Sequence, residues 1–331
     1  MTAQFNAQQR RDFLKSLAAL SGSLPLWAQA QSSWPTKPVT MVVPFPAGGG
    51  TDAFARPLSA QFAKLTGKQL IIDNRGGAGG TLGAGVAAKS APDGYNLLIS
   101  SNTTFTVNAA LKKNLPYDPQ KDFESIGLIG SSPLVLLAHP KVPANNVKEL
   151  LALAKADPKG LNFGSFGVGT SAHLAGEMFK VMTGAHMVHV AYRGSAPAMT
   201  DLIGGQIPLS FDTSVAAMPQ MATGKVKAIA VTTRQRSPQM PQVPTVAEAG
   251  FPDYEMVPWI GLVARRGMPA EVSGKLAQAL KDSVNDPVVK AELQKVGLDV
   301  LFQPGSVYDA KVAQELPLLR AYVHRANIPV E

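Results

Sequence analysis

One stretch sets the architecture of this chain: Val39-Thr40-Met41-Val42-Val43-Pro44-Phe45-Pro46-Ala47-Gly48-Gly49-Gly50-Thr51-Asp52. Its apolar, β-branched beginning predicts a buried strand, and the three consecutive glycines predict a turn after that strand. Thr51 or Asp52 is then expected to cap a helix, because the apolar positions that follow fall near helical spacing: Phe54, Leu58, Phe62 and Leu65. The sequence therefore predicts a strand, a glycine loop and a helix N-terminus in direct succession.

Such a loop directs unpaired backbone N–H groups, and the positive end of a helix dipole, toward whatever lies above it. A nucleotide phosphate and a small carboxylate both suit that geometry. Neither Lys nor Arg lies between Thr40 and Ala55, so an anion bound there would be held mainly by the main chain. We interpret the loop as half of a binding site for a small carboxylate.

The composition is that of an ordinary globular protein. The 331 residues are 45% hydrophobic, which allows a sizeable core and favours two domains over one. The absence of cysteine excludes a disulfide framework, a thiolate metal site and a thiol nucleophile. The formal net charge is +8, but the basic residues are scattered, so a nucleic-acid partner is not expected.

The first 30 residues have the pattern of a secretory signal peptide. The basic segment Arg10-Arg11-Asp12-Phe13-Leu14-Lys15 precedes a short apolar run, and Ala28-Gln29-Ala30 supplies small residues for cleavage. The paired arginines resemble a twin-arginine signal, and a Sec signal that happens to carry them is the alternative. The apolar run is too short for a membrane span, so we expect export to the periplasm.

After the opening unit, strands alternate with helices, which predicts α/β architecture with mostly parallel sheets. Ligands bind beyond the carboxyl ends of the strands in such sheets. The polar set Ser101-Asn102-Thr103-Thr104 follows the strand Asn96–Ser100, so these residues, Asn102 and Thr103 first among them, are candidate ligand contacts. A plain helix cap is the alternative for these residues.

The opening pattern then recurs more than a hundred residues later. A strand ends at Ser165, the loop Phe166-Gly167-Val168-Gly169-Thr170-Ser171 follows, and a helix is expected from His173 onward. Two units of this kind suggest two domains whose helix N-termini face one another across a cleft.

With these motifs the chain resembles the Bug family, extracytoplasmic solute receptors associated with tripartite tricarboxylate transporters. The resemblance covers the whole chain after the signal and is carried by these segments: 44–52, Asn74-Arg75, Pro92-Asp93-Gly94-Tyr95, Asn162-Phe163-Gly164-Ser165, His173-Leu174-Ala175-Gly176-Glu177, His189-Val190-Ala191-Tyr192-Arg193-Gly194, 243–250 and Trp259-Ile260-Gly261-Leu262. It implies a type II periplasmic-binding-protein fold, with two α/β lobes joined by two crossing segments and a ligand cleft between them. On this basis one lobe comprises residues 34–132 and 258–331, and the other comprises residues 133–257.

The resemblance also implies which residues bind the ligand. Main-chain groups and water from the two glycine loops would hold a ligand carboxylate, and the positions concerned are Phe45, Ala47, Gly48, Gly49 and Asp52 in the first loop and Ser165, Gly167, Gly169, Thr170 and His173 in the second. Phe45 and Phe166 would pack on the apolar part of the ligand. Asp212, at a strand end, would accept a hydrogen bond from a ligand ammonium or hydroxyl group, or would cap the next turn. Arg193 would serve packing or the rim.

Catalytic and metal-binding alternatives lack complete signatures. Ser165, His173 and Asp212 could form a nucleophilic triad, but a nucleophile elbow needs glycine where Phe163 stands. A dinucleotide fingerprint starting at Gly77 and Gly79 would need a third glycine where Leu82 stands. His186 and His189 have a spacing seen in metal sites, but no third ligand is evident.

The sequence thus predicts a monomeric periplasmic solute-binding protein, not an enzyme, with no cofactor and no metal. It would capture a small organic carboxylate between two lobes and deliver it to a membrane permease of the tripartite tricarboxylate type. A ligand-sensing receptor for a membrane signalling partner is the main alternative, and a secreted α/β hydrolase is the other.

Overall fold

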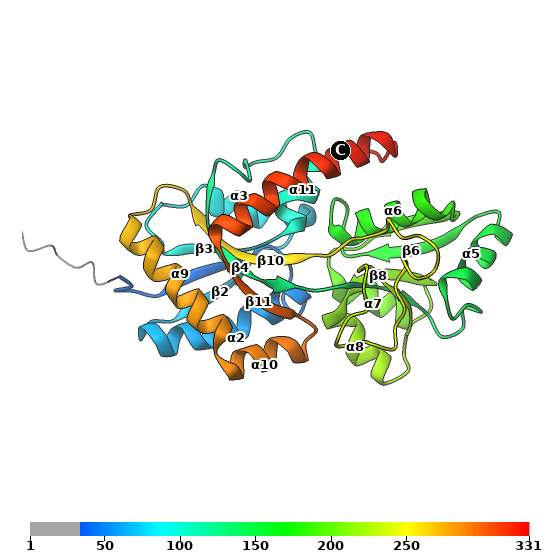
Figure 1. Cartoon of the computed structure of the whole chain (residues 1–331), viewed down its shortest axis with the longest axis horizontal. Helices are drawn as coiled ribbons and strands as arrows, with labels where there is room; N and C mark the ends of the chain where they lie inside the picture. Colours follow the sequence, from blue (N-terminus) through cyan, green and yellow to red (C-terminus); the bar gives the residue numbers. More distant parts are fainter. Residues whose placement is uncertain (1–33, 331) are drawn as a thin grey trace, which may run out of the picture. The chain divides into compact units, whose positions relative to one another are not determined.

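The computed structural model describes residues 34–330, and the predicted signal peptide lies outside them. Two α/β lobes, each built on its own sheet, make up this part of the chain (Figure 1). The fold class predicted from the sequence is confirmed. Across residues 34–330, no helix combines the length and the apolar character that a membrane crossing requires.

The sheet of the first lobe has six strands in the order β11-β4-β10-β3-β1-β2. β1 pairs in parallel with β2 and β3, whereas β10 runs antiparallel between β3 and β4, and β11 runs antiparallel to β4. The strands are β1 (Val39–Val43), β2 (Leu70–Asn74), β3 (Asn96–Ser101), β4 (Phe123–Ser131), β10 (Trp259–Arg265) and β11 (Asp299–Pro304).

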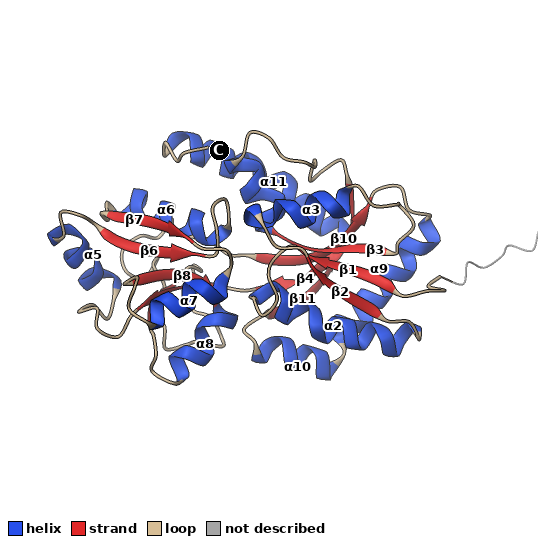
Figure 2. Ribbon diagram, turned by 180° about the vertical axis from the view of Figure 1, so that it is seen from behind, coloured by secondary structure: helices blue, strands red, loops and turns tan. Residues whose placement is uncertain are grey.

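Helices cover both faces of this sheet (Figure 2). Val42 and Leu98 belong to the core shared with α3 and α11, whereas Met41 and Leu97 lie against α2 and α9. Because successive side chains of a strand point to opposite faces, burial on both faces accounts for the three successive apolar residues Met41, Val42 and Val43 of β1. The helical elements of this lobe are α2 (Gly50–Thr66), η1 (Ala78–Gly80), α3 (Thr81–Ala88), η2 (Thr103–Val107), α4 (Asn108–Leu111), α9 (Ala270–Asn285), α10 (Pro287–Lys295) and α11 (Gly305–Arg325).

The second lobe has a five-stranded sheet in the order β7-β6-β8-β5-β9. β6 pairs in parallel with β7 and β8, and β5 runs antiparallel to β8 and β9. The strands are β5 (Leu134–Ala138), β6 (Leu161–Ser165), β7 (Met187–Ala191), β8 (Leu209–Thr213) and β9 (Lys227–Val231). The helices are α5 (Val147–Ala156), α6 (Ser171–Thr183), α7 (Ser195–Ile203) and α8 (Ser214–Ala222).

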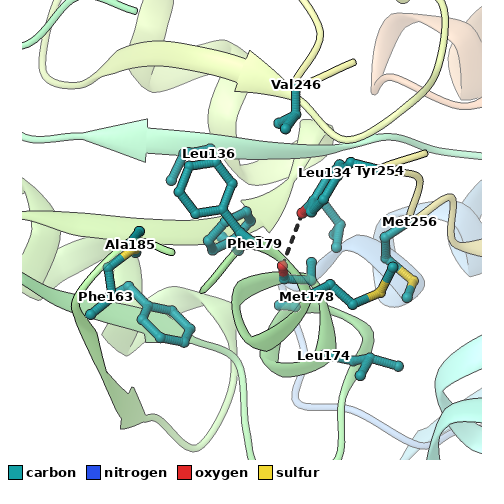
Figure 3. Packing of buried hydrophobic residues seen from close by; sticks show 14 of the residues in the cluster. Leu134, Leu136, Phe163, Leu174, Met178, Phe179, Ala185, Val246, Tyr254 and Met256 are labelled. Carbon is teal, nitrogen blue, oxygen red and sulfur yellow. Dashed lines mark hydrogen bonds between the residues drawn. The ribbon is translucent and has the colours of Figure 1, made fainter. Parts of the chain in front are cut away.

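The core of the second lobe lies between its sheet and α6. Figure 3 shows Phe163, Phe179 and Tyr254 in this cluster, where the Tyr254 hydroxyl donates a 2.9 Å hydrogen bond to the carbonyl of Ala175. Gly176 in α6 allows close packing, since a Cβ at this position would lie 2.1 Å from the Phe163 ring.

The chain crosses between the sheets twice, after β4 and before β10. The two crossings run side by side, and the N–H of Ser132 donates to the carbonyl of Pro258 at 2.9 Å. Helix α11 is a third link: Tyr308 and Val312 pack in the first lobe, whereas Leu316 and Val323 join the cluster that contains the α6 core.

The beginning of α2 differs from the sequence prediction. Gly49 is the N-cap, and Thr51 and Asp52 lie in the first turn, so neither of them caps the helix. Three of the four predicted apolar positions are buried, but Leu65, in the last turn, is 46% exposed.

Candidate ligand-binding site

A cavity lies between the two lobes and measures about 690 Å³ when its space open to solvent is included. The start of α2 lines one side of it, the start of α7 lines another, and Ser132 and Pro258 from the crossings also contribute. Among the described residues that line the cavity, none is Asp, Glu, Lys, Arg or His. The lining itself therefore contributes backbone dipoles and neutral side chains.

The N-terminus of α2 reaches this cavity without a capping side chain. Its N-cap is Gly49, and the first intrahelical hydrogen bond runs from the N–H of Ala53 to the carbonyl of Gly49 at 3.0 Å. The amides of Gly50 and Thr51 precede that bond, and both residues line the cavity. Such amides form an anion site together with the helix dipole.

The N-terminus of α7 reaches the same cavity from the second lobe. Its N-cap is Gly194, again without a side-chain cap, and Ser195 and Ala196 line the cavity. Pro197 follows them and has no N–H to satisfy. Two uncapped helix N-termini from different lobes therefore meet at one cavity.

Asp52 holds the first glycine loop in place beneath the cavity. Its buried carboxylate accepts hydrogen bonds from the N–H of Gly48 at 2.9 Å, from the Asn74 amide at 3.1 Å and from the Arg56 guanidinium at 2.9 Å. Burial by itself would raise the pKa of Asp52, but the hydrogen bonds from Gly48, Asn74 and Arg56 bring it below its usual value. Gly48 and Asp52 thus bond to each other, and neither lines the cavity.

The N-terminus of α6, predicted to be the opposing half of the site, is capped instead. The Thr170 hydroxyl accepts from the N–H of His173 at 3.4 Å, and the Thr103 hydroxyl accepts from the N–H of Ser171 at 3.1 Å. Thr103 belongs to the first lobe, so this second bond joins the lobes directly. Side chains already satisfy amides that an anion would need.

Ser165 faces a different histidine from the one expected. Its Oγ lies 2.7 Å from Nε2 of His189, whose ring stacks on His173 with centroids 4.2 Å apart. Nδ1 of His173 accepts from the N–H of Gly169 at 3.2 Å. Burial first, and then the neighbouring His173 and Lys180, lower the pKa of His189 to about 3, so its ring is neutral at pH 7.

Asp212 lies directly behind the cavity wall. The Ser195 hydroxyl donates to its carboxylate at 2.8 Å, and the N–H of Thr213 donates at 2.7 Å. Burial raises the pKa of Asp212 to about 6, although both of these hydrogen bonds act in the opposite direction. Ser165 and His173 share one cluster through His189, whereas Asp212 bonds to Ser195 and Thr213, so the three do not form the triad considered above.

Phe45 and Phe166, one from each lobe, separate the cavity from a second hollow. Their rings meet edge to face with centroids 6.2 Å apart, and both residues line both spaces. The outer hollow measures about 1390 Å³ including open solvent, and Lys112, Gly167 and Arg193 also line it.

The structure therefore places the predicted site residues in several groups. Phe45, Ala47, Gly49, Asn102 and Thr103 line the cavity. The other predicted residues do not: Gly48, Asp52, Ser165, Gly167, Gly169, Thr170, His173 and Asp212.

Sequence reasoning did not single out the N-terminus of α7 as part of the site. The signal was present, since a predicted strand ending near Ala191 is followed by Gly194 and then by small residues that open a helix. Phe54 also lines the cavity without having been named as a candidate, and so does Ser101, which belongs to the predicted polar set.

Two α/β lobes that enclose a cavity between opposed helix N-termini define a type II periplasmic binding protein. Residues 54–320 match the family described as "Tripartite tricarboxylate transporter family receptor". The chain belongs to this family.

Known relatives agree with this assignment. BugT of Bordetella pertussis is 34% identical over 78% of this chain and 79% of its own length. The solved structure of Rpa4515 from R. palustris with adipate is 32% identical, with a TM-score of 0.87 over 90% of this chain and all of that one. MatC from Rhodopseudomonas palustris with bound malate is also 32% identical, with a TM-score of 0.82 over 88% of this chain and all of that one.

Proposed function

We propose that this protein is a periplasmic receptor that captures a small organic carboxylate between its lobes and delivers it to a permease of the tripartite tricarboxylate type. One observation carries the proposal: two uncapped helix N-termini, of α2 and α7, meet at a cavity with no charged side chain among its described lining residues. Backbone amides at helix N-termini stabilise an anion without a cation. The relatives solved with adipate and malate support the same ligand class.

In this proposal the carboxylate accepts hydrogen bonds from the amides of Gly50, Thr51, Ser195 and Ala196, all of which line the cavity. Bridging both lobes through one anion favours the closed arrangement, because neither helix N-terminus then has to be solvated separately. Phe45, Ala47, Gly49, Asn102 and Thr103 complete the contacts. The remaining predicted residues, such as Asp52 and Asp212, act by positioning the loops.

The ligand would enter past the Phe45–Phe166 pair from the outer hollow. Lys112 and Arg193 are the basic residues among the described residues that line this hollow. Positive charge at the rim of a cleft raises the local concentration of anions and their association rate. This gives Arg193 a role in ligand capture rather than in ligand contact.

A solute receptor of this kind carries out no reaction on its ligand, and we propose no enzymatic activity. Ser165 pairs with His189 but does not line the cavity, so this serine–histidine pair lies outside the space where a ligand would bind. We also propose that the receptor acts as a monomer.

The proposed lobe boundaries follow the crossings. Residues 34–132 and 258–331 would form one lobe and residues 133–257 the other, which places the Ser132–Pro258 hydrogen bond at the hinge. Export through residues 1–30, by the twin-arginine route, is part of the same proposal. Changing both Arg10 and Arg11 to Lys should then block export, and unchanged export would argue for the Sec route.

A thermal-shift panel tests the function. A ligand that binds only the folded state raises the melting temperature by mass action, by several degrees when its concentration is about a hundred times Kd. The panel would contain aliphatic dicarboxylates, tricarboxylates, acidic amino acids and aromatic acids, with the corresponding amides as uncharged controls. A shift with a carboxylate but not with its amide supports the proposal. No shift with any carboxylate would contradict it.

A further inference from the structure

The walls of the cavity show which kind of carboxylate it suits. Three aromatic side chains line it, Phe45, Phe54 and Phe166, and Pro197 and Ile260 add further apolar surface. Aromatic rings bind other rings favourably in offset or edge-to-face geometry, as Phe45 and Phe166 bind each other. The lining is thus apolar over most of its described residues, and its anion site is confined to the helix N-termini.

Two polar side chains of the wall, Ser195 and Asn102, offer acceptor oxygens to a ligand. The Ser195 hydroxyl uses its proton on Asp212, so only its oxygen lone pairs remain for a ligand. The Asn102 side chain is 1% exposed, and its Nδ2 is directed to the sulfur of Met256 at 3.7 Å. Its Oδ1 is buried and has no hydrogen-bond partner among the described residues.

Ser101 adds a second unsatisfied oxygen next to Asn102. Its Oγ is also buried without a partner in the described part of the chain, and it can donate or accept. Buried polar atoms are nearly always hydrogen-bonded. Two neighbouring residues whose buried oxygens lack a partner in a cavity wall therefore indicate that the bound ligand supplies the missing hydrogen-bonding group. An acceptor such as the Asn102 Oδ1 requires a donor from the ligand.

We propose that the receptor selects a monocarboxylic acid with an aromatic body and a hydrogen-bond donor away from its carboxylate, as in a hydroxy-substituted aromatic acid. The inference rests on the proposed function, because it takes the carboxylate to lie at the helix N-termini. It distinguishes this chain from the relatives solved with adipate and malate, both of which are dicarboxylates.

A second ligand carboxylate would meet unfavourable partners in this cavity. No Lys, Arg or His stands among the described lining residues to pair with it. The unsatisfied Asn102 oxygen and the committed Ser195 hydroxyl present lone pairs, which repel a carboxylate and accept from a hydroxyl group. An ionised group buried without a partner loses more in desolvation than it gains.

Isothermal titration of the purified protein tests the selectivity. The probes are benzoate and its three monohydroxy isomers, adipate and malate as dicarboxylates, and phenol as the ring without a carboxylate. We expect the best hydroxybenzoate to bind about tenfold more tightly than benzoate, which corresponds to one net hydrogen bond. We expect both dicarboxylates to bind more weakly than benzoate, and phenol to give no measurable binding.

The possible failures are distinguishable. Tighter binding of adipate or malate than of every aromatic acid would overturn this inference and leave the proposed function intact. An absence of binding by every carboxylate in this set and in the thermal-shift panel would overturn the proposed function itself.

Two variants test whether Asn102 and Ser101 cause the preference for a ligand that carries a hydrogen-bond donor. Asn102→Leu keeps the side-chain volume and removes the acceptor, so the ratio of benzoate Kd to hydroxybenzoate Kd should fall from about ten to near one. Ser101→Ala provides the same test if Asn102→Leu does not fold, with a ratio below about three. Asn96→Leu, at the other end of β3 and outside the cavity lining, is the matched control and should leave the ratio unchanged. A ratio that stays near ten in both test variants would contradict the assignment.

Discussion

The two glycine loops share one sequence pattern and have different fates. In each, a strand ends, glycines turn the chain and a helix begins, at α2 in the first lobe and at α6 in the second. The first residues of α2 line the cavity and have no capping side chain, whereas Thr170 and Thr103 accept from the amides of His173 and Ser171 in α6. A helix N-terminus is therefore available to a ligand only when no side chain caps it.

The partner that opposes α2 is therefore α7, whose N-cap is Gly194. Glycine at an N-cap contributes no side-chain oxygen, so the amides behind it are left to bind water or a ligand. The helices α2 and α7 both have a glycine N-cap, whereas the capped helix α6 has threonine.

The largest loss of carboxylate affinity is expected when one N–H is removed from a helix that binds the ligand. Gly50→Pro deletes the first amide of α2 at a position where proline is tolerated, and Ser171→Pro does the same in α6. We expect Gly50→Pro to weaken carboxylate binding by 10- to 100-fold, approximately the value of a charge-assisted hydrogen bond, and Ser171→Pro by less than about threefold. Titration with the best carboxylate of the panel measures both.

Gly50→Ala is the matched control for this pair. It adds the Cβ, which would lie 3.2 Å from the Thr213 side chain, but it keeps the N–H. If Gly50→Ala weakened binding as much as Gly50→Pro, crowding rather than the lost amide would be responsible. The assignment of the α2 amides to the anion site would then be wrong.

The second test concerns what holds the first loop. Asp52→Ala leaves the N–H of Gly48 and the Asn74 amide without their acceptor and should lower the free energy of unfolding by about 2 kcal/mol. Chemical denaturation measures this value, and Asp52→Asn shows how much of the loss is due to charge. A loss below about 0.5 kcal/mol would mean that the loop holds its shape without the carboxylate.

Acid should affect the two loops in sequence. The pKa of His189 is lowered from about 6.5 to about 3, so the unfolded chain takes up this proton first. The stability that neutral His189 contributes is complete above pH 6.5 and is lost as the pH falls toward 3. Asp52, whose pKa also lies below its usual value of 3.8, contributes stability that is lost only below that value.

Hydrogen exchange at pH 7 and pH 5, corrected for intrinsic rates, checks this order. Peptides covering 161–192 should lose protection at pH 5 while peptides covering 39–56 keep it. The overall loss should be about 1–2 kcal/mol by pH 4, less than for a fully buried group because the His189 ring is half-buried. The variant His189→Gln should abolish the difference between the loops, and equal protection in the unmodified protein would contradict the assignment.

The smallest effect is expected when the N-cap hydroxyl of α6 is removed. Thr170→Ala removes the hydroxyl that accepts from the N–H of His173 and should cost about 1 kcal/mol of stability. Carboxylate affinity should change by less than twofold, because the cap does not line the cavity. A stability loss with unchanged affinity separates α6 from α2, and a gain of a second anion site would show that capping alone distinguishes them.

Local sequence patterns were sufficient to predict the fold class. Apolar strands such as β1 and β5, and the alternation of strands with helices, predicted two α/β lobes, and resemblance supplied how they connect. The strand β11 and the helix α10 were not predicted, since Asp299–Pro304 shows no strict alternation and is only partly buried at the sheet edge.

The site was predicted in part. Phe45, Ala47 and Gly49 line the cavity because the strand–loop–helix geometry fixes where they lie, and that geometry is local. Whether a second helix is capped depends on Thr103, which lies 68 residues from Ser171 in the sequence. No local pattern contains such a contact, and this is why α6 rather than α7 was selected.

Helix α11 adds a mechanical constraint to this two-lobed receptor. It begins on the first sheet with Tyr308 in that core, and its later residues Leu316 and Val323 join a cluster whose members come from both lobes, among them Ala109 of the first and Leu174 of the second. Hinge opening must therefore either bend this 21-residue helix or separate its last turns from their neighbours in the second lobe. Separation would expose apolar side chains to water. Burial of these side chains favours the closed arrangement, so substitutions at Leu316 or Val323 are expected to change ligand affinity from a helix that does not line the cavity.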